Sequence, residues 1–576
     1  MLDHVIRGAT VVDGTGGPAR VTDVGIRDGL IAVIGQVTEE SRTFEDATGL
    51  VLCPGFVDPH THYDAQLFWD PYATPSLNHG VTTVAAGNCG FTLAPLNPAR
   101  PEDADYTRRM MSKVEGMSLV ALEEGAPWSW HSFGEYLDAL EGRIAVNAGF
   151  MVGHCALRRH VMGADAVGGQ PSEEQLAEIV RLLHEAMDAG AWGFSTTQST
   201  THSDGDGRPV ASRHASPAEL IAMSKAVGEH EGTQIEAIVA GCLDQFSDAE
   251  IDLLVDMSAA AGRPLNWNVL TIDAQVPERV PRQLHASERA RKAGGRVVAL
   301  TMPILTPMNM SLGTFCALNL IPGWGPVLGL PVPERIEKLA DPDVRAELLR
   351  RAQSKEAGVF RRLADFGRYV IGDTYSPENE GLTGRVVRDI AEERGQDPFA
   401  TLVEICSNDQ LRTVLWPMPR DNDPASWALR AETWRHEDVL LGGSDAGAHL
   451  DRMCGAPYTT RFLGDCLRGR GLVGLEQAVR MLTDDPAQLF GLRRRGRVEE
   501  GFHADLVLFD PERIDAGKAT LVHDLPGDSP RLDSKAIGIK AVWVNGVESL
   551  RDDVPTGAVP GRVLRSGTDT RTVSTK

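Results

Sequence analysis

Residues 51–62 read Val-Leu-Cys-Pro-Gly-Phe-Val-Asp-Pro-His-Thr-His, an apolar run that ends in two histidines. A short apolar run that Gly and Pro interrupt is typical of a buried strand. Further runs of this kind follow at intervals along the chain, each separated from the next by a segment with helical periodicity. Candidate strands occupy residues 51–57, 81–86, 146–152, 191–195, 234–239, 265–270, 297–302 and 439–443.

The segments between these strands carry signals for helix starts. Ser132-x-x-Glu135 and Ser172-x-x-Gln175 have the form of capping boxes, and Ser216 and Ser247 open similar segments. A further helix is expected near residues 287–293. Eight strands that alternate with helices predict an α/β fold in which a parallel sheet closes into a (β/α)8 TIM barrel.

Both ends of the chain show a different pattern. Residues 4–36, 504–509 and 541–546 alternate apolar and polar side chains, which is typical of strands in a half-buried sheet. We therefore expect a small β-sandwich domain formed by both termini. The expected domains are a β-sandwich part at 1–55, a barrel at 56–489 with an inserted segment at about 303–437, and a second β-sandwich part with a tail at 490–576.

Composition limits the classes of function. The chain has 576 residues and a formal net charge of −23, which argues against nucleic acid or an anionic membrane as a partner. No apolar run is long enough to span a bilayer, and the first residues have no signal-peptide core. The eight cysteines are scattered, which predicts reduced thiols and a cytoplasmic location. The expected partner is a small-molecule substrate, and a homo-oligomer stays open.

Four side chains follow the ends of three strands that are neighbours in a closed barrel. His60 and His62 end the first strand, and residues i and i+2 of an extended chain point the same way. Cys89 follows the second strand and Asp445 the eighth, and catalytic groups of such barrels lie at these ends. Taken singly, Cys89 could be a buried thiol and Asp445 a helix cap. Together, imidazole, thiolate and carboxylate predict a site for a divalent metal and favour zinc.

Several motifs resemble the N-acyl-D-amino-acid deacylase (D-aminoacylase) branch of the amidohydrolase superfamily. This resemblance implies a TIM barrel, a small terminal β-sandwich and zinc-dependent hydrolysis of an amide. It also implies that His60, His62, Cys89 and Asp445 are metal ligands and that Asp445 is the general base. The motifs that carry the resemblance are residues 55–64, 80–90, 152–154, 193–195 and 560–565.

The sequence departs from this family on the fifth and sixth strands. Where the family pattern has two metal-binding histidines, an ungapped comparison places Ala237 and Val269. The adjacent Arg and Lys of the pattern become Val239 and Thr271. Such side chains cannot replace an imidazole ligand or a cation that binds a carboxylate. We therefore expect one metal ion, and a substrate that is not held by its carboxylate in the family's manner.

Other polar residues near strand ends are candidates for the site. His154 and His202 follow the third and fourth strands and are candidates for catalysis. His154 could donate to a substrate oxygen or only satisfy a loop carbonyl. His202 could be a metal ligand, a proton shuttle or a substrate contact, or it could only hold its loop together. Glu236, His449 and Arg452 are candidates for substrate binding, although strand alternation could turn Glu236 outward.

The predicted function is that of a hydrolase whose metal activates water to cleave a linear or cyclic C–N amide bond. The same activated water could instead cleave an ester, a lactone or a C–C bond of a diketone, and the fold alone does not choose. A non-catalytic barrel with a structural metal is a third possibility. The presence of Asp445 beside His60 and His62 favours an enzyme, because a structural site needs no base.

Overall fold

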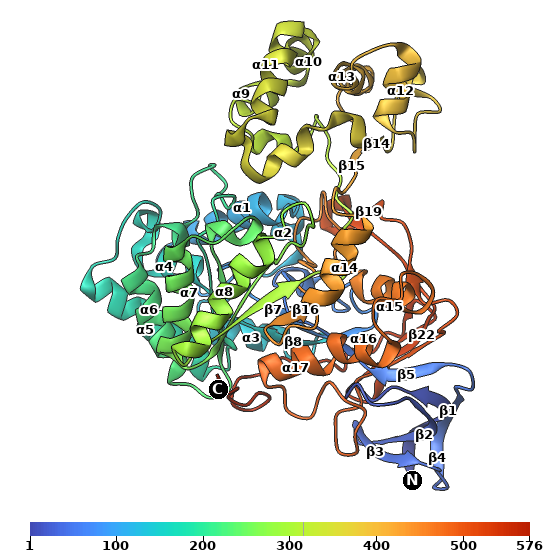
Figure 1. The fold of residues 1–576 in the computed structure, drawn as a ribbon. Helices are drawn as coiled ribbons and strands as arrows, with labels where there is room; N and C mark the ends of the chain where they lie inside the picture. The colour runs from blue at the N-terminus through green and yellow to red at the C-terminus, as the bar shows by residue number, and fades with distance from the viewer. Residues whose placement is uncertain (315, 576) are drawn as a thin grey trace. The chain divides into compact units, whose positions relative to one another are not determined.

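The computed structural model describes residues 1–314 and 316–575, and it contains two compact units (Figure 1). The first unit comprises residues 1–306, 425–450 and 454–576, and the second comprises 307–424 and 451–453. Each unit has its own hydrophobic core. The expected domain limits stay predictions, and residues 315 and 576 of those ranges lie outside the described part. Among the described helices, none combines the length and apolar character that crossing a bilayer requires.

The first unit contains a barrel of parallel strands. Its third strand is made of two short pieces, β8 and β9, and each neighbouring pair of strands is parallel. A parallel bridge between Thr61 and Ala446 joins the loops after the first and last strands, which confirms the predicted closed barrel. In chain order the barrel strands are β6 (Phe56–Asp58), β7 (Val81–Ala86), β8 (Asn147–Phe150), β9 (Val152–Gly153), β10 (Gly193–Thr197), β11 (Gln234–Ile238), β12 (Pro264–Trp267), β13 (Arg296–Thr301) and β16 (Val439–Leu441).

The first predicted strand is in fact two strands that belong to different sheets. Residues 51–57 divide at Gly55 into β5 (Val51–Pro54) of the terminal sheet and β6 of the barrel. A Cβ atom at Gly55 would lie 2.0 Å from Oγ1 of Thr82, so this close passage requires glycine. The chain thus passes directly from one domain into the other.

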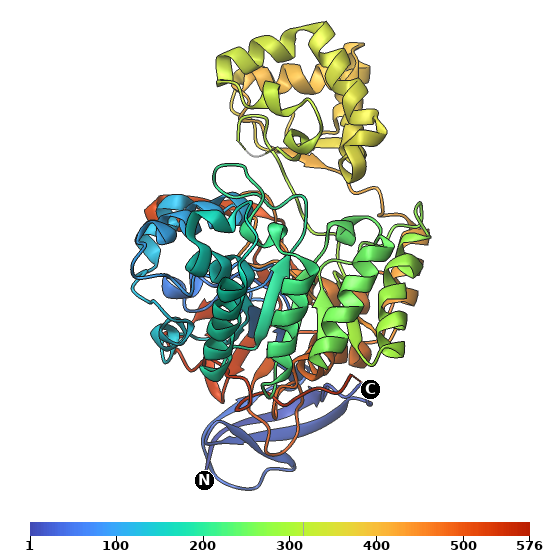
Figure 2. The same ribbon diagram turned by 90° about the vertical axis from the view of Figure 1, so that its left-hand side faces the viewer.

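Helices cover the outside of the barrel strands, and Figure 2 shows those of residues 150–300 side by side. The predicted caps are confirmed: Ser132, Ser172 and Ser247 form capping boxes, and the Ser216 side chain accepts from the Glu219 backbone N–H. The helix expected at 287–293 is longer than predicted. Helices that precede barrel strands are α3 (Phe133–Leu140), α5 (Glu173–Asp188), α6 (Pro217–Gly228), α7 (Asp248–Ala261), α8 (Arg279–Lys292) and α14 (Pro424–Thr433). Further helices are α1 (Glu102–Glu115), α2 (Leu119–Gly125), α4 (His154–Met162), α15 (Tyr458–Arg468), α16 (Leu475–Leu482) and α17 (Asp484–Phe490).

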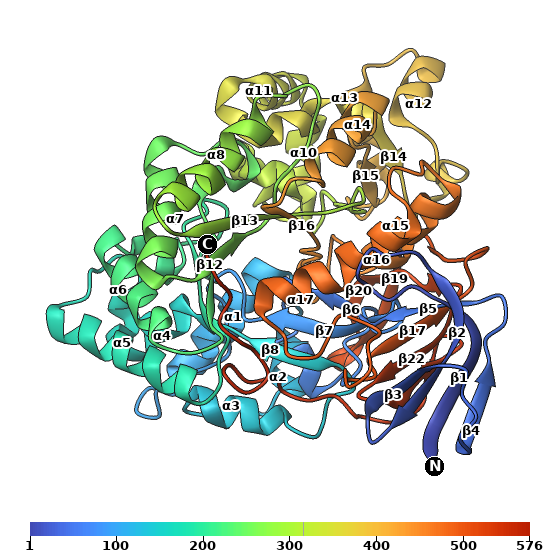
Figure 3. The same cartoon turned by 60° about the horizontal axis from the view of Figure 1, so that its bottom comes forward.

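Strands from both ends of the chain form one mixed sheet, which confirms the terminal β domain (Figure 3). The strand β17 lies between β5 from the N-terminal part and β22 from the C-terminal part, antiparallel to both. The strands of this sheet are β1 (Leu2–Val11), β2 (Arg20–Arg27), β3 (Leu30–Gly35), β4 (Ser41–Asp46), β5, β17 (Leu506–Phe509), β22 (Ile539–Val544), β23 (Val547–Arg551) and β24 (Val554–Pro555). The remaining short strands of this unit are β18 (Asp515–Ala516), β19 (Thr520–Leu525), β20 (Ser529–Asp533) and β21 (Ala536–Ile537).

The C-terminal tail is hydrogen-bonded to the barrel. Val563 forms a parallel bridge with Ala148 of β8, and the backbone N–H of Leu564 donates to the Ala148 carbonyl at 2.8 Å. The Leu564 carbonyl accepts from the indole N–H of Trp192, which is fully buried. The tail therefore extends the hydrogen bonding of a barrel strand.

The second unit is mainly helical. Its core includes Phe366 and Phe399, whose stacked rings lie 4.2 Å apart, and the fully buried Trp324. Two short strands pair antiparallel at its edge. Its elements are α9 (Gly325–Leu328), α10 (Val332–Ala340), α11 (Pro342–Gln353), β14 (Tyr369–Ile371), α12 (Val387–Arg394), α13 (Pro398–Asn408) and β15 (Leu415–Pro417).

Candidate metal centre

Three of the predicted metal ligands lie together at the carboxyl ends of β6 and β7. The ligand atoms of His60, His62 and Cys89 all lie within 4.8 Å of one another, and the three side chains are buried. The Cys89 sulfur lies 3.5 Å from Nε2 of His60. The His-x-His spacing thus brings both rings to the thiol, at the position where the sequence predicts a metal site.

Asp445 brings a carboxylate to the same group from the loop after β16. Its Oδ1 atom lies 3.2 Å from Nε2 of His60 and 3.9 Å from Nε2 of His62. The same oxygen accepts a hydrogen bond of 3.0 Å from the carboxamide of Asn268, which follows β12. The structure therefore brings the four predicted ligands to one end of the barrel.

The turn that carries Cys89 is held across the barrel by β10 and β11. Cys89 has a φ of +55°, in the left-handed region that non-glycine residues rarely adopt. Its backbone N–H donates to Oε2 of Glu236 at 2.8 Å, and the next N–H, of Gly90, donates to the Ser195 hydroxyl at 3.0 Å. Ser195 in turn donates to the Gly87 carbonyl at 2.5 Å. These bonds hold a strained turn in one conformation, as is common at functional sites.

A second set of hydrogen bonds fixes the histidine and aspartate loops. The Asp58 carboxylate accepts from the His60 backbone N–H at 3.3 Å and from the Ser444 hydroxyl at 2.5 Å. The backbone N–H of Asp445 donates to the His60 carbonyl at 3.2 Å. These hydrogen bonds therefore hold the loop after β6, the first barrel strand, against the loop after β16, the last one.

Burial sets the protonation of the four groups. It lowers the pKa of His60 well below its usual value and that of His62 to about 3, so both rings are neutral and can act as ligands. It raises the pKa of the Cys89 thiol, mainly by desolvation and then through the charge of Glu236. Burial and the nearby Asp58 charge raise the pKa of Asp445 to about 7. A thiolate and a carboxylate in such surroundings need a cation, which a divalent metal provides.

Two further predicted residues lie next to these ligands. Glu236 is fully buried and contacts the Cys89 backbone, so its side chain points into the barrel and not outward. His202 has Nδ1 2.9 Å from the Thr197 hydroxyl and its ring 5.2 Å from that of Phe91. Burial lowers the pKa of His202 to about 4. Burial is also the main cause of the lowered pKa values of His60 and His62, to which His202 adds a smaller electrostatic effect.

His154 instead belongs to a separate buried network. Its Nδ1 lies 2.9 Å from the Thr196 hydroxyl and its Nε2 2.9 Å from the Glu219 carboxylate. Glu219 also accepts two hydrogen bonds from Arg158, of 2.7 and 2.6 Å. Both ring nitrogens therefore have partners within the described structure, which favours a structural role for His154 over a catalytic one.

The remaining two predicted residues fall in different compact units. His449 belongs to the first unit and has a φ of +51°, whereas Arg452 belongs to the second and pairs with Asp451 at 2.7 Å. Their role in substrate binding stays a prediction.

Sequence reasoning missed two neighbours of the centre. Glu115, the last residue of α1, has Oε1 3.4 Å from Nδ1 of His62, and both side chains are buried. Because the Glu115 carboxylate faces Nδ1 of His62, the other ring nitrogen, Nε2, remains available to a metal. Asn268 is the second neighbour, through its bond to Asp445. No local motif marks Glu115, because the contact joins a connecting helix to a strand end.

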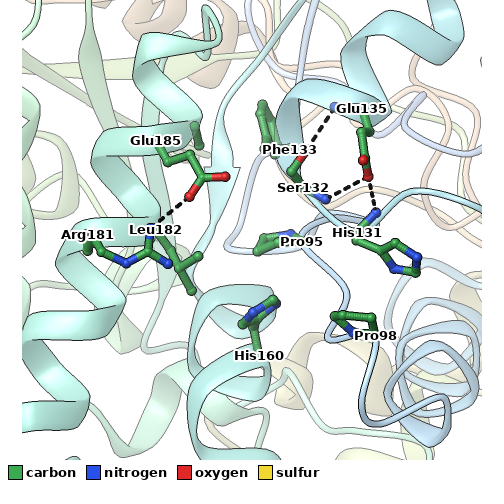
Figure 4. Close-up of a pocket in the computed structure, with 11 residues that line it drawn as sticks. Pro95, Pro98, His131, Ser132, Phe133, Glu135, His160, Arg181, Leu182 and Glu185 are labelled. Carbon is green, nitrogen blue, oxygen red and sulfur yellow. Dashed lines mark hydrogen bonds and ion pairs between the residues drawn. The ribbon is translucent and has the colours of Figure 1, made fainter.

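A hollow of about 220 Å³ lies elsewhere on the unit, between the loop before α3 and the helices α4 and α5 (Figure 4). Glu135 in it accepts backbone N–H bonds from His131 and Ser132, and Arg181 pairs with Glu185. None of its residues belongs to the metal-binding group. The polar contacts are those of a helix cap and a surface ion pair.

The barrel and its donor set define a class of metal-dependent hydrolases with the metal at the carboxyl ends of the strands. Residues 43–549 match the amidohydrolase family, and the chain belongs to that family. It is therefore a hydrolase of the amidohydrolase type, which acts on carbon–nitrogen bonds other than peptide bonds.

Known relatives align over almost the full length. The chain is 29% identical to a D-aminoacylase of Alcaligenes xylosoxydans xylosoxydans, over 98% of this chain and 97% of that protein. It is 30% identical to an N-acyl-D-aspartate deacylase of the same organism, over 98% and 95%. It also resembles the crystal structure of N-acyl-D-glutamate deacylase from Bordetella bronchiseptica, complexed with zinc and a phosphonate inhibitor, with a TM-score of 0.65, 25% identity and coverage of 98% and 100%.

Proposed function

We propose that this enzyme hydrolyses the amide bond of a small molecule with one zinc ion held by His60, His62, Cys89 and Asp445. The observation that carries the proposal is the convergence of these four side chains at one end of the barrel. A hydrolytic role is favoured over a structural metal because a carboxylate suited to be a base lies within the group.

The donor set fits zinc. One thiolate, two imidazoles and one carboxylate match the ligands that zinc prefers, and hard cations favour oxygen alone. Nε2 of His60 lies 3.5 Å from the Cys89 sulfur and 3.2 Å from the Asp445 carboxylate. Bound there, zinc would polarise a substrate carbonyl and lower the pKa of water.

The chain's own residues would then handle the proton. Asp445 is placed to take a proton from the attacking water and return it to the leaving nitrogen. Asn268 donates to Oδ1 of Asp445, which leaves Oδ2 for that transfer. Glu115 orients the ring of His62 through Nδ1.

The substrate proposal follows from what the fifth and sixth strands lack. Relatives are deacylases of N-acyl-D-amino acids by name, but Val239 is buried and apolar here. The Thr271 hydroxyl accepts from Arg279 at 3.1 Å. We propose a linear or cyclic amide that is recognised without the family's carboxylate-binding cations.

A cytoplasmic location is part of the proposal. The eight cysteines are free, and seven are buried, as expected of a protein that needs no disulfide.

Metal analysis of the wild type and three variants tests the proposal. The wild type should carry one equivalent of zinc, Cys89→Ala should lose it, and Asp445→Ala should retain zinc without turnover. Cys53→Ala, which changes another buried cysteine in β5, is the matched control and should retain both its zinc and its turnover. Wild-type protein that binds no zinc, or full activity of Asp445→Ala, would contradict the proposal.

A substrate screen tests the bond type. Acylated D-amino acids, the same compounds with their carboxylates amidated, cyclic amides, esters, lactones and diketones would be compared by kcat/KM. We expect amides to be preferred and the amidated compounds to react at least as well as the free acids. Preference for a lactone or diketone would refute amide specificity.

A further inference from the structure

His202 lies at the carboxyl end of β10, beside the turn that carries Cys89. Thr197 is the last residue of β10, and Nδ1 of His202 lies 2.9 Å from its hydroxyl oxygen. A Cβ atom on Gly90 would lie 3.4 Å from the backbone nitrogen of Thr197, so the Cys89 turn packs directly against this strand end. The His202 ring also lies 5.2 Å from that of Phe91. His202 therefore borders the metal-binding group.

The hydrogen bonds of Thr197 determine which ring nitrogen of His202 carries the hydrogen. The Thr197 side chain is fully buried, and its hydroxyl oxygen accepts the Ser199 backbone N–H at 3.0 Å. A hydroxyl also has one hydrogen to donate, and a buried donor without an acceptor is costly. Among the described residues, the acceptor beside this hydroxyl is Nδ1 of His202. The hydroxyl therefore donates to Nδ1, and the neutral ring carries its hydrogen on Nε2.

Nε2 of His202 is left as a donor for a ligand. Within the described structure, Nδ1 is the nitrogen of this ring that has a hydrogen-bond partner, and the residue is only half-buried. Because burial lowers the pKa of His202 to about 4, the ring is neutral and has a single N–H. His154 differs, since both of its ring nitrogens have protein partners.

The proposed reaction needs a donor of this kind. When water attacks an amide carbonyl, an electron pair of the C=O bond moves to the oxygen, which becomes negatively charged. A zinc ion with four protein donors that also binds water has few positions left for that oxygen. A fixed N–H donor at the developing charge supplies the missing stabilisation. Asn268 is already used in this way by Asp445.

We propose that His202 is a catalytic residue that donates a hydrogen bond from Nε2 to the amide oxygen, and that Thr197 is the positioning residue that fixes its tautomer. His202 transfers no proton in this role. When the C–N bond breaks, the electron pair on oxygen forms the C=O bond again, and Asp445 returns its proton to the leaving nitrogen. This inference rests on the proposed function, because it adds an oxyanion donor to that reaction.

NMR reads the tautomer without measuring activity. Long-range ¹H–¹⁵N correlation spectra of the zinc-loaded enzyme, labelled with ¹⁵N-histidine, show which ring nitrogen carries the hydrogen. We expect the wild type to carry it on Nε2 of His202, whose signal is identified by its loss in His202→Gln. Thr197→Val keeps the shape of the side chain without the hydroxyl and should give a mixture of tautomers. Thr197→Ser should restore the wild-type tautomer.

Kinetics test the donor itself. The probes are N-acetyl-D-amino acids with amidated carboxylates, which offer neutral amides. His202→Phe keeps an aromatic ring beside Phe91 but has no N–H, so kcat should fall by about 10²- to 10³-fold with KM nearly unchanged. Thr197→Val should lower kcat by about 10-fold, and Thr197→Ser should recover it. His202→Gln offers an N–H of similar reach, should retain more kcat than His202→Phe, and allows the test even if His202→Phe does not fold.

Two variants serve as matched controls. His184→Phe replaces another half-buried histidine, on α5, and Thr433→Val removes another buried hydroxyl, on α14. Both should keep the wild-type kcat and the His202 tautomer.

The outcomes separate this inference from the proposed function. A wild-type spectrum with the hydrogen on Nδ1 of His202, or with no hydrogen on Nε2 because that nitrogen binds zinc, would overturn the inference and leave the zinc hydrolase intact. Equal kcat in wild type and His202→Phe, or an equal loss in His184→Phe, would do the same. Wild type that hydrolyses no amide in the substrate screen would overturn the proposed function and the role of His202 with it.

Discussion

The two halves of the barrel's carboxyl end carry different chemistry. The half formed by β6, β7 and β16 presents His60, His62, Cys89 and Asp445, which are zinc ligands by type. The half formed by β10, β11 and β12 presents a hydroxyl, a carboxylate and a carboxamide, which bond to the first half. The comparison suggests a division of roles: the first half carries the proposed hydrolytic chemistry, and the second half is where we expect this chain to depart from its family's pattern.

Removal of the histidine pair should have the largest effect. The double variant His60→Ala/His62→Ala lacks two ligands from the first half, so we expect loss of zinc and amide hydrolysis at the level of the buffer. Zinc content and kcat/KM check this. His131→Ala, an exposed histidine outside the centre, should change neither. Activity that survives the double variant would mean that the second half alone supports catalysis.

Asp445→Asn should separate binding from chemistry within the first half. Because the amide still offers an oxygen ligand but cannot take a proton, we expect kcat to fall by about 10²- to 10⁴-fold. Zinc content should stay at one equivalent. Asp343→Asn on α11 is the control, with unchanged kcat. A loss of zinc in proportion to the loss of rate would show that Asp445 acts as a ligand alone.

Glu219→Ala tests whether the buried network of His154 serves stability. It leaves Arg158 buried without its carboxylate partner, which should lower the free energy of unfolding by about 3–5 kcal/mol. The kcat/KM of the folded enzyme should be unchanged. Denaturant unfolding and kinetics at low temperature check this, with the exposed Glu173→Ala as control. A large loss of kcat without loss of stability would assign His154 to catalysis.

Ser195→Ala should have the smallest effect of these four. The variant removes two hydrogen bonds that hold the Cys89 turn, so we expect zinc affinity to fall by about 10- to 100-fold. Competition with a chelator measures it. Ser224→Ala, which removes a buried hydroxyl within α6, should leave zinc affinity unchanged. Equal affinities of Ser195→Ala and the wild type would show that the second half does not support the turn.

The sequence predicts the barrel and the grouping of the four proposed ligands because both depend on local signals. Each capping serine marks the start of a helix through bonds within a few residues of sequence. The His-x-His spacing directs the rings of His60 and His62 to the same side of the chain. Positions just after strands converge in any closed barrel, so Cys89 and Asp445 follow from the fold.

What the sequence does not predict are contacts that need three-dimensional placement. Glu115 reaches His62 from the end of a connecting helix, and no spacing rule relates the two. The direction of Glu236 depends on the phase of β11 in the barrel, which alternation alone leaves open. The division of residues 51–57 between two sheets depends on the packing of Gly55 against Thr82.

The bridge between Val563 and Ala148 has a consequence for biosynthesis. A ribosome makes Ala148 long before Val563, so β8 lacks this hydrogen-bonding partner while the intervening chain is synthesised. During that time the nascent chain exposes an unfinished strand edge, which can pair with other chains. Pairing of β8 with residue 563 must therefore follow synthesis of the eighth barrel strand, β16.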